Sequence, residues 1–116
     1  MLTTSLIILI AVIHVWFLVL EMFLWTKPLG LKLMVITSKQ AEDTKIMAMN
    51  QGLYNGMIAA YLIWCLNRND FATVTFIMGS IVIAGCYGAW TAKKPIIFFI
   101  QSLPAVVALI ALKLAA

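Results

Sequence analysis

The sequence predicts an all-α fold, an integral membrane four-helix bundle, and three observations favour it. Apolar residues make up 65% of the 116-residue chain. Charged residues are few, with 8 Lys and Arg and 4 Asp and Glu, well below the ~25% that is usual in a soluble domain. Separate apolar windows also approach the ~20 residues that a helix needs to cross the hydrocarbon. We therefore expect a single four-span transmembrane domain, residues 1–116, without a separate soluble domain.

The predicted spans cover residues 2–25, 46–66, 71–90 and 96–112. Pro28 and Gly30 end the first span, a polar turn at residues 67–70 separates the second from the third, and the segment 93–95 (Lys-Lys-Pro) interrupts the last pair. The first window lacks a positively charged start and a small-residue cleavage site. We therefore expect it to be retained as a span and not removed as a signal peptide.

The second helix is predicted to begin before the membrane, at about residue 38. Thr37 and Gln40 match a capping box, in which the Thr37 hydroxyl accepts from the Gln40 amide and the Gln40 side chain reaches back. The first turns then carry four charges, Lys39, Glu42, Asp43 and Lys45. This charged segment is predicted to project into the cytosol as a solvated helix face.

Lysine and arginine residues fall unequally on the two sides of the predicted bundle. The loops before spans two and four hold Lys27, Lys32, Lys39, Lys45, Lys93 and Lys94, whereas the other side holds Arg68 and Lys113. Because cytoplasmic loops are enriched in these residues, both termini are predicted outside in a multi-pass protein of the inner cell membrane. Topology explains the net charge of +4, so membrane lipids are the expected partners and nucleic acid is not.

The two cysteines, Cys65 and Cys86, are predicted to remain unpaired. A helical hairpin would place them at opposite faces of the bilayer, too far apart for a disulfide. Without further cysteines or a second histidine they do not make a soft-metal site. Neither a metal nor a cofactor is therefore predicted.

Polar residues gather at the start of the second span, in residues 50–56 (Asn-Gln-Gly-Leu-Tyr-Asn-Gly). Gln51 and Asn55 are four residues apart, as are Asn50 and Tyr54, so the four side chains share one broad helix face. The two glycines of this segment are also four apart, a spacing that lets another helix approach closely. Packing within the chain is favoured over a homo-oligomer, which remains the alternative.

Glu21 is the only acid in any predicted span, and His14 is the only histidine of the chain. At 1.5 Å per residue, Glu21 lies ~6 Å inside the cytoplasmic boundary, and Tyr87 and Gln101 lie at a similar depth. His14 shares the face of Glu21 but lies ~10 Å away along the axis. Because an ionisable group in a span costs ~2.5–3.5 kcal/mol, it indicates a functional site. The predicted ligand-binding or proton-linked residues are Glu21, His14, Asn50, Gln51, Tyr54, Asn55, Tyr87 and Gln101.

These residues resemble a known family. The resemblance is carried by His14, residues 21–25 (Glu-Met-Phe-Leu-Trp), residues 50–56, Gly85, Tyr87-Gly88 and residues 101–105 (Gln-Ser-Leu-Pro-Ala). Together they look like the bacterial membrane family called domain of unknown function 1304, over almost the whole chain. The resemblance implies a small integral membrane protein with four helices and no assigned activity. It favours the same eight residues.

Three functions fit the sequence. The first is binding or transport of a small, mostly apolar ligand through a polar pocket in the cytoplasmic half, with Glu21 as proton acceptor. Small multidrug resistance exporters are similar in span count and acid placement, although the glycine and aromatic pattern here differs. The second is an intramembrane enzyme acting on a lipid-like substrate with Glu21 and His14 as an acid/base pair; no nucleophile motif supports it, so catalytic residues stay unassigned. The third is an accessory structural subunit.

Overall fold

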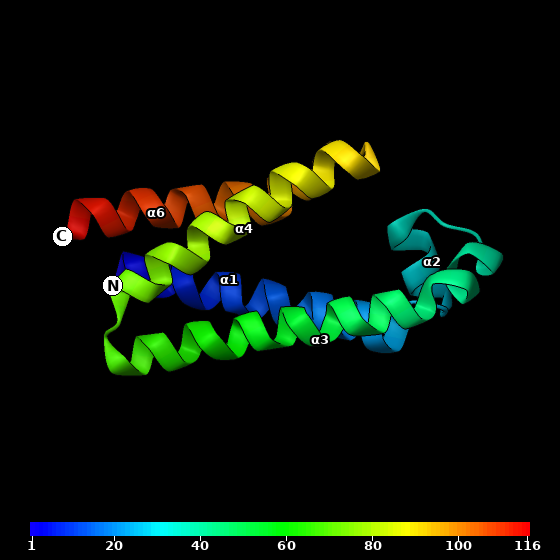
Figure 1. Ribbon diagram of the computed structural model, residues 1–116, viewed down its shortest axis with the longest axis horizontal. Coiled ribbons are helices and arrows are strands. Elements are labelled where there is room, and N and C mark those ends of the chain that lie inside the picture. Colours follow the sequence, from blue (N-terminus) through cyan, green and yellow to red (C-terminus); the bar gives the residue numbers. More distant parts are fainter. The chain divides into compact units, whose positions relative to one another are not determined.

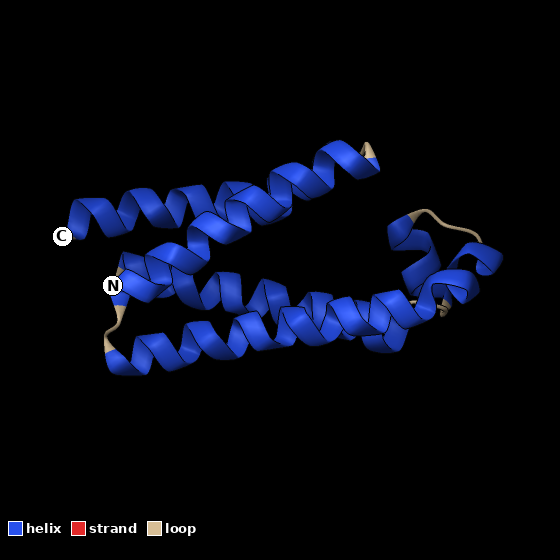
Figure 2. Ribbon diagram, viewed as in Figure 1, coloured by secondary structure: helices blue, strands red, loops and turns tan.

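The computed structural model describes residues 1–116, and all of its regular structure is helical (Figures 1 and 2). The elements are α1 (Leu2–Val19), the π-helical turn η1 (Leu20–Leu24), α2 (Pro28–Met34), α3 (Ser38–Arg68), α4 (Phe71–Ala92), α5 (Pro95–Ile97), the π-helical turn η2 (Phe98–Ser102) and α6 (Leu103–Ala115). The predicted all-α class is confirmed. The short helix α2 and the two π-helical turns were not predicted from the sequence.

Three helical segments are long and apolar enough to cross a membrane. They are Leu2–Leu24, Phe71–Ala92 and Pro95–Ala115, and by length and composition they indicate a membrane protein. The 31-residue helix α3 is the longest of the fold but is not among them. Its charged first turns and the amides of residues 50–55 make it less apolar than the others.

Contacts divide the chain into two compact units, which we describe separately. The central unit is Val12–Ala60, and the terminal unit combines Met1–Ala11 with Tyr61–Ala116. The central unit holds the end of α1, η1, α2 and most of α3. The terminal unit holds the start of α1, the end of α3 and all elements from α4 to α6.

In the central unit, the chain turns sharply after η1 and enters α2. Gly30 is buried, and a Cβ at this position would collide with the carbonyl oxygen of Leu24 and lie 3.2 Å from Trp25 Cα. Only a glycine therefore lets α2 pack this closely against the end of η1. Helix α2 ends at Met34, and the residue that caps it, Val35, has a left-handed backbone with φ of 55°.

The start of α3 is held by two sets of hydrogen bonds. The Gln40 amide donates to Thr37 Oγ1 at 3.1 Å, and the Thr37 amide donates to Gln40 Oε1 at 2.9 Å. This reciprocal pair is the predicted capping box, and α3 begins directly after Thr37. The Trp25 indole also donates to Thr44 Oγ1 at 3.0 Å, so the first turns of α3 are tied to the residue that follows η1.

The core of the terminal unit is apolar. Its fully buried large side chains include Ile7, Ile10, Leu62, Val74, Met78 and Ile81. Helix α4 begins at an N-cap, Asp70, whose carboxylate accepts from the Thr73 amide at 3.0 Å and from the Thr73 hydroxyl at 2.6 Å. Both cysteines are free thiols, with Cys65 buried and Cys86 exposed.

Candidate functional site

A hydrogen bond between Glu21 and Asn55 forms the centre of the candidate site. The Asn55 side-chain amide donates from Nδ2 to Glu21 Oε1 over 2.6 Å. Both residues are half-buried and belong to the central unit. They lie 34 positions apart in the sequence, so the bond joins the end of the first span to the middle of α3.

Two glycines of α3 allow the approach that this bond requires. A Cβ at Gly52 would lie 2.5 Å from Met22 Cγ, and 3.2 Å from both Glu21 Cβ and the Leu18 carbonyl oxygen. A Cβ at Gly56 would collide with Leu18 Cδ1. The small residues therefore bring the α3 backbone against η1 and the last turns of α1, as expected for this spacing in membrane helices.

Glu21 also lies within a π-helical turn, Leu20–Leu24. In such a turn the backbone N–H of residue i donates to the carbonyl of residue i−5 and not to that of residue i−4, and single turns of this kind are frequent at functional sites. The same stretch thus combines the only membrane-embedded acid with a local departure from α-helical geometry.

The other polar residues of α3 do not join the Glu21–Asn55 bond. Asn50 is exposed, and its amide donates to the Ile46 carbonyl of its own helix at 2.9 Å. Gln51 and Tyr54 are exposed as well. Of the four predicted polar residues of α3, only Asn55 hydrogen-bonds to Glu21.

His14 is buried in the structure. Only 1% of its surface is exposed, and its ring meets the Phe17 ring edge to face with centroids 5.6 Å apart. A buried imidazole against an aromatic ring is suited to packing as well as to proton transfer. Its geometry therefore does not single out an acid/base role.

The two remaining predicted residues belong to the terminal unit. Tyr87 is 63% exposed on α4, and its ring lies edge to face with that of Trp90 at 6.1 Å. Gln101 is half-buried within η2. Each of the two π-helical turns thus carries one of the eight predicted residues.

Ser102, which the sequence did not indicate as a site residue, makes a close contact with α4 in the terminal unit. It is fully buried, and its hydroxyl donates to the Val82 carbonyl at 2.9 Å. A Cβ at Gly85 would collide with Ser102 Oγ and lie 3.0 Å from the Ser102 amide nitrogen. The only hint in the sequence was its place next to Gln101.

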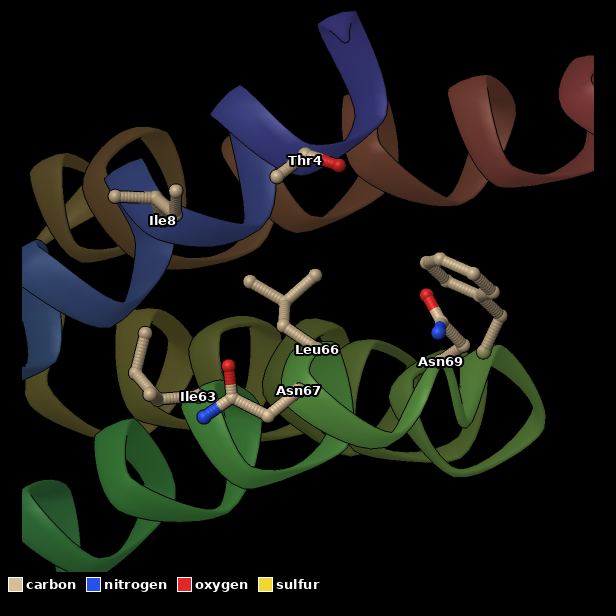
Figure 3. A pocket seen from close by; sticks show the side chains of 7 residues that line it. Thr4, Ile8, Ile63, Leu66, Asn67 and Asn69 are labelled. Carbon is tan, nitrogen blue, oxygen red and sulfur yellow. The ribbon is translucent and has the colours of Figure 1, made fainter.

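A cavity of about 450 Å³ lies in the terminal unit (Figure 3). It is lined by Thr4, Ile8, Ile63, Leu66, Asn67, Asn69 and Phe71. The side chains come from the start of α1, the end of α3 and the turn into α4. None of the eight predicted site residues lines this cavity.

The chemistry available at the candidate site follows from one carboxyl group. Within the central unit, Glu21 accepts a hydrogen bond at Oε1 only, which leaves Oε2 for a proton or for a ligand donor. An asparagine amide can donate to a carboxylate or accept from a carboxylic acid after rotation, so Asn55 suits both protonation states. Together they can hold a polar or cationic group of a ligand within the span.

Comparison with known families relates the chain to proteins of unknown function. The family model described as "Protein of unknown function (DUF1304)" matches residues 8–113, a range that includes all eight predicted site residues. The resemblance predicted from the sequence is therefore confirmed. Comparison with curated proteins and with solved structures finds no match.

Proposed function

Because the chain belongs to the DUF1304 family of proteins of unknown function, we propose its function from its own geometry: it binds a small, mostly apolar ligand at Glu21, within the membrane. The observation that carries the proposal is the bond from Asn55 to Glu21 inside the first apolar segment. A carboxyl group there is costly to insert, at about 2.5 to 3.5 kcal/mol. One hydrogen bond between membrane helices returns only about 0.6 to 2 kcal/mol.

The difference between these two magnitudes argues for a use beyond packing. A chain selected only for stability would lose little by replacing both Glu21 and Asn55 with apolar side chains. A ligand that brings its own donor or positive charge to Oε2 would use the carboxyl group fully. Its remaining surface would be apolar, since α1 and α3 expose large apolar side chains such as Trp16 and Leu53.

We place this site in the cytoplasmic half of a four-span bundle in the inner membrane, with both termini outside. Helix α3 is the fourth crossing in this proposal, since its residues 46–66 have the ~20-residue length required. The distribution of lysine and arginine supports the orientation. The start of α1 and the α3–α4 turn line one cavity, in keeping with both lying on the same side. Release of the ligand on the opposite side would make the protein a transporter.

Dicyclohexylcarbodiimide, a small apolar reagent that modifies protonated carboxyl groups, tests whether the site accepts such molecules. We expect it to label Glu21 in the full chain reconstituted in phosphatidylcholine vesicles, as read by peptide mass spectrometry. Glu42 provides an internal control, because it is the only other glutamate and lies exposed on the first turns of α3. Absence of label on Glu21, or equal label on Glu42, would contradict an apolar site.

A second experiment distinguishes binding of a ligand at Glu21 from accessibility of Glu21 to the reagent. Tetraphenylphosphonium, an apolar cation, is expected to slow the labelling of Glu21 and to bind at least tenfold more weakly to the Glu21→Gln variant. The thermal stability of Glu21→Gln is expected to stay close to that of the parent chain, because glutamine keeps an oxygen for Asn55. A loss of stability without any loss of binding would instead indicate a structural role.

A further inference from the structure

The short helix α2 and its flanking residues form a surface that the Glu21 site does not use. Leu29 and Leu33 are four residues apart, so they share one face of the helix, and they are 48% and 50% exposed. Val35, directly after the helix, is 82% exposed. Three large apolar side chains exposed within seven residues are suited to contact with an apolar phase or partner.

Two lysines flank this apolar face. Lys27 precedes α2 and Lys32 lies within it, and both are exposed. The other two lysines of the central unit are neutralised, since Lys39 pairs with Asp43 at 3.1 Å and Lys45 pairs with Glu42 at 2.5 Å. The two lysines of the central unit that form no ion pair, Lys27 and Lys32, therefore both lie at α2.

The place of α2 directly after the first apolar segment predicts its height in the membrane. The first apolar segment ends at Leu24, and Gly30, in the middle of α2, packs directly against the Leu24 carbonyl. Trp25, whose indole bonds to Thr44, lies at the same level, where tryptophan is enriched at membrane surfaces. Helix α2 is thus held where hydrocarbon gives way to headgroups.

From this arrangement we propose that α2 is an interfacial helix that binds anionic phospholipids of the surrounding bilayer. Leu29 and Leu33 insert between the acyl chains near the headgroups, as the apolar face of such helices does. Lys27 and Lys32 extend along this face and pair with the negatively charged headgroups. This inference is independent of the ligand site at Glu21, and either can fail without the other.

The depth of the helix can be measured in the full chain. A polarity-sensitive fluorophore is attached to Leu33→Cys in a background with both native cysteines replaced by alanine, and the chain is placed in vesicles of phosphatidylcholine and phosphatidylglycerol. We expect blue-shifted emission and the strongest quenching by a lipid that carries its spin label near the headgroup. Ser38→Cys, exposed at the start of α3, is the matched control and should emit as in water.

The role of the lysine charges is tested by native mass spectrometry with defined lipids. The chains used in this experiment keep both native cysteines. The preference of the parent chain for phosphatidylglycerol over phosphatidylcholine is expected to fall by about fivefold for each of Lys27→Gln and Lys32→Gln, the ratio that corresponds to about 1 kcal/mol per lysine near a charged surface. Lys39→Gln is the matched control, since its charge is already paired with Asp43, and should leave the preference unchanged.

Three outcomes would overturn the proposal. The first is water-like emission from the Leu33 probe in vesicles. The second is an equal loss of lipid preference in Lys39→Gln and in the α2 variants, which would mean that only net charge matters. The third is a probe that is shielded from every lipid quencher and becomes exposed on dilution of the protein, which would place a second copy of the chain on α2.

Discussion

The Glu21 contact of the central unit and the Ser102 contact of the terminal unit are built from the same parts. Each sets a π-helical turn against a glycine of another helix: η1 against Gly52, and η2 against Gly85. In both, the glycine lets a polar side chain of the turn make a hydrogen bond to the other helix. The difference lies in which polar group fills the position.

Ser102 is neutral, fully buried and satisfied by a backbone carbonyl. Glu21 is ionisable, half-buried and bonded through one oxygen to a side chain. The first arrangement costs little and closes the contact completely. The second retains a carboxyl group that is costly to insert into a membrane. Its second oxygen accepts no hydrogen bond from the central unit, as a ligand site needs. The comparison therefore assigns packing to the Ser102 contact and supports the ligand site that we propose at the Glu21 contact.

The largest expected effect comes from filling the space at Gly85. Gly85→Ala should lower the free energy of unfolding by about 2 to 3 kcal/mol, because its Cβ meets the short Ser102 side chain and the Ser102 backbone, neither of which can move far. Gly52→Ala should cost about 1 kcal/mol, since its nearest neighbour is the flexible Met22 side chain. Unfolding in mixed detergent micelles measures both.

Gly79 provides the matched control on the same helix as Gly85. A Cβ there meets nothing within 4 Å, so Gly79→Ala should stabilise the chain by up to about 1 kcal/mol through helix propensity. If Gly79→Ala and Gly85→Ala destabilise equally, the tight Ser102 contact is not what holds α4 and η2 together. A larger loss at Gly52 than at Gly85 would reverse the comparison.

A smaller effect is expected from the polar groups themselves. Ser102→Ala should lower stability by about 1 kcal/mol, because it removes a buried hydrogen bond and leaves a void of one atom. Glu21→Gln should change stability by less than about 0.5 kcal/mol, because the bond from Asn55 is retained. The opposite ranking in the same unfolding measurement would make Glu21 the structural residue of the pair.

The sequence predicted the parts of this comparison that depend on composition and spacing. Apolar windows predicted the long helices, and the capping box at Thr37 and Gln40 predicted the start of α3. These features are readable because each depends on one helix at a time, on its period and on the residues at its start. Glu21 and Asn55 were both predicted as site residues, and Asn55 does donate to Glu21, but the bond between them did not follow from helix depth.

The remaining features depend on how two helices meet. A π-helical turn has no composition of its own, so η1 and η2 could not be recognised before the structure was known. A single serine in an apolar run gives no sign that it will be buried against Gly85, as Ser102 is. Helix α2 was missed because Pro28 and Gly30 indicate the end of a helix, whereas here they start α2 and let it pack against Leu24.

The smallest expected effect is a response to acid at the start of α4, which tests whether pH acts on the Ser102 contact. Hydrogen bonds from the Thr73 hydroxyl and amide hold the pKa of Asp70 below its usual value. A carboxyl group whose pKa is lower in the folded chain than in the unfolded chain stabilises the fold at pH values above the unfolded pKa, near 4. This stabilisation is lost as pH falls through the folded pKa.

Between pH 6 and pH 3 we therefore expect faster hydrogen exchange, corrected for the intrinsic rate, at the Thr73 amide. Asp70→Asn should remove this change, since asparagine also caps helices but does not titrate. The Gly85 amide should keep its protection throughout, because Ser102 does not titrate in this range; an equal loss at Gly85 would show that the two ends of α4 open together.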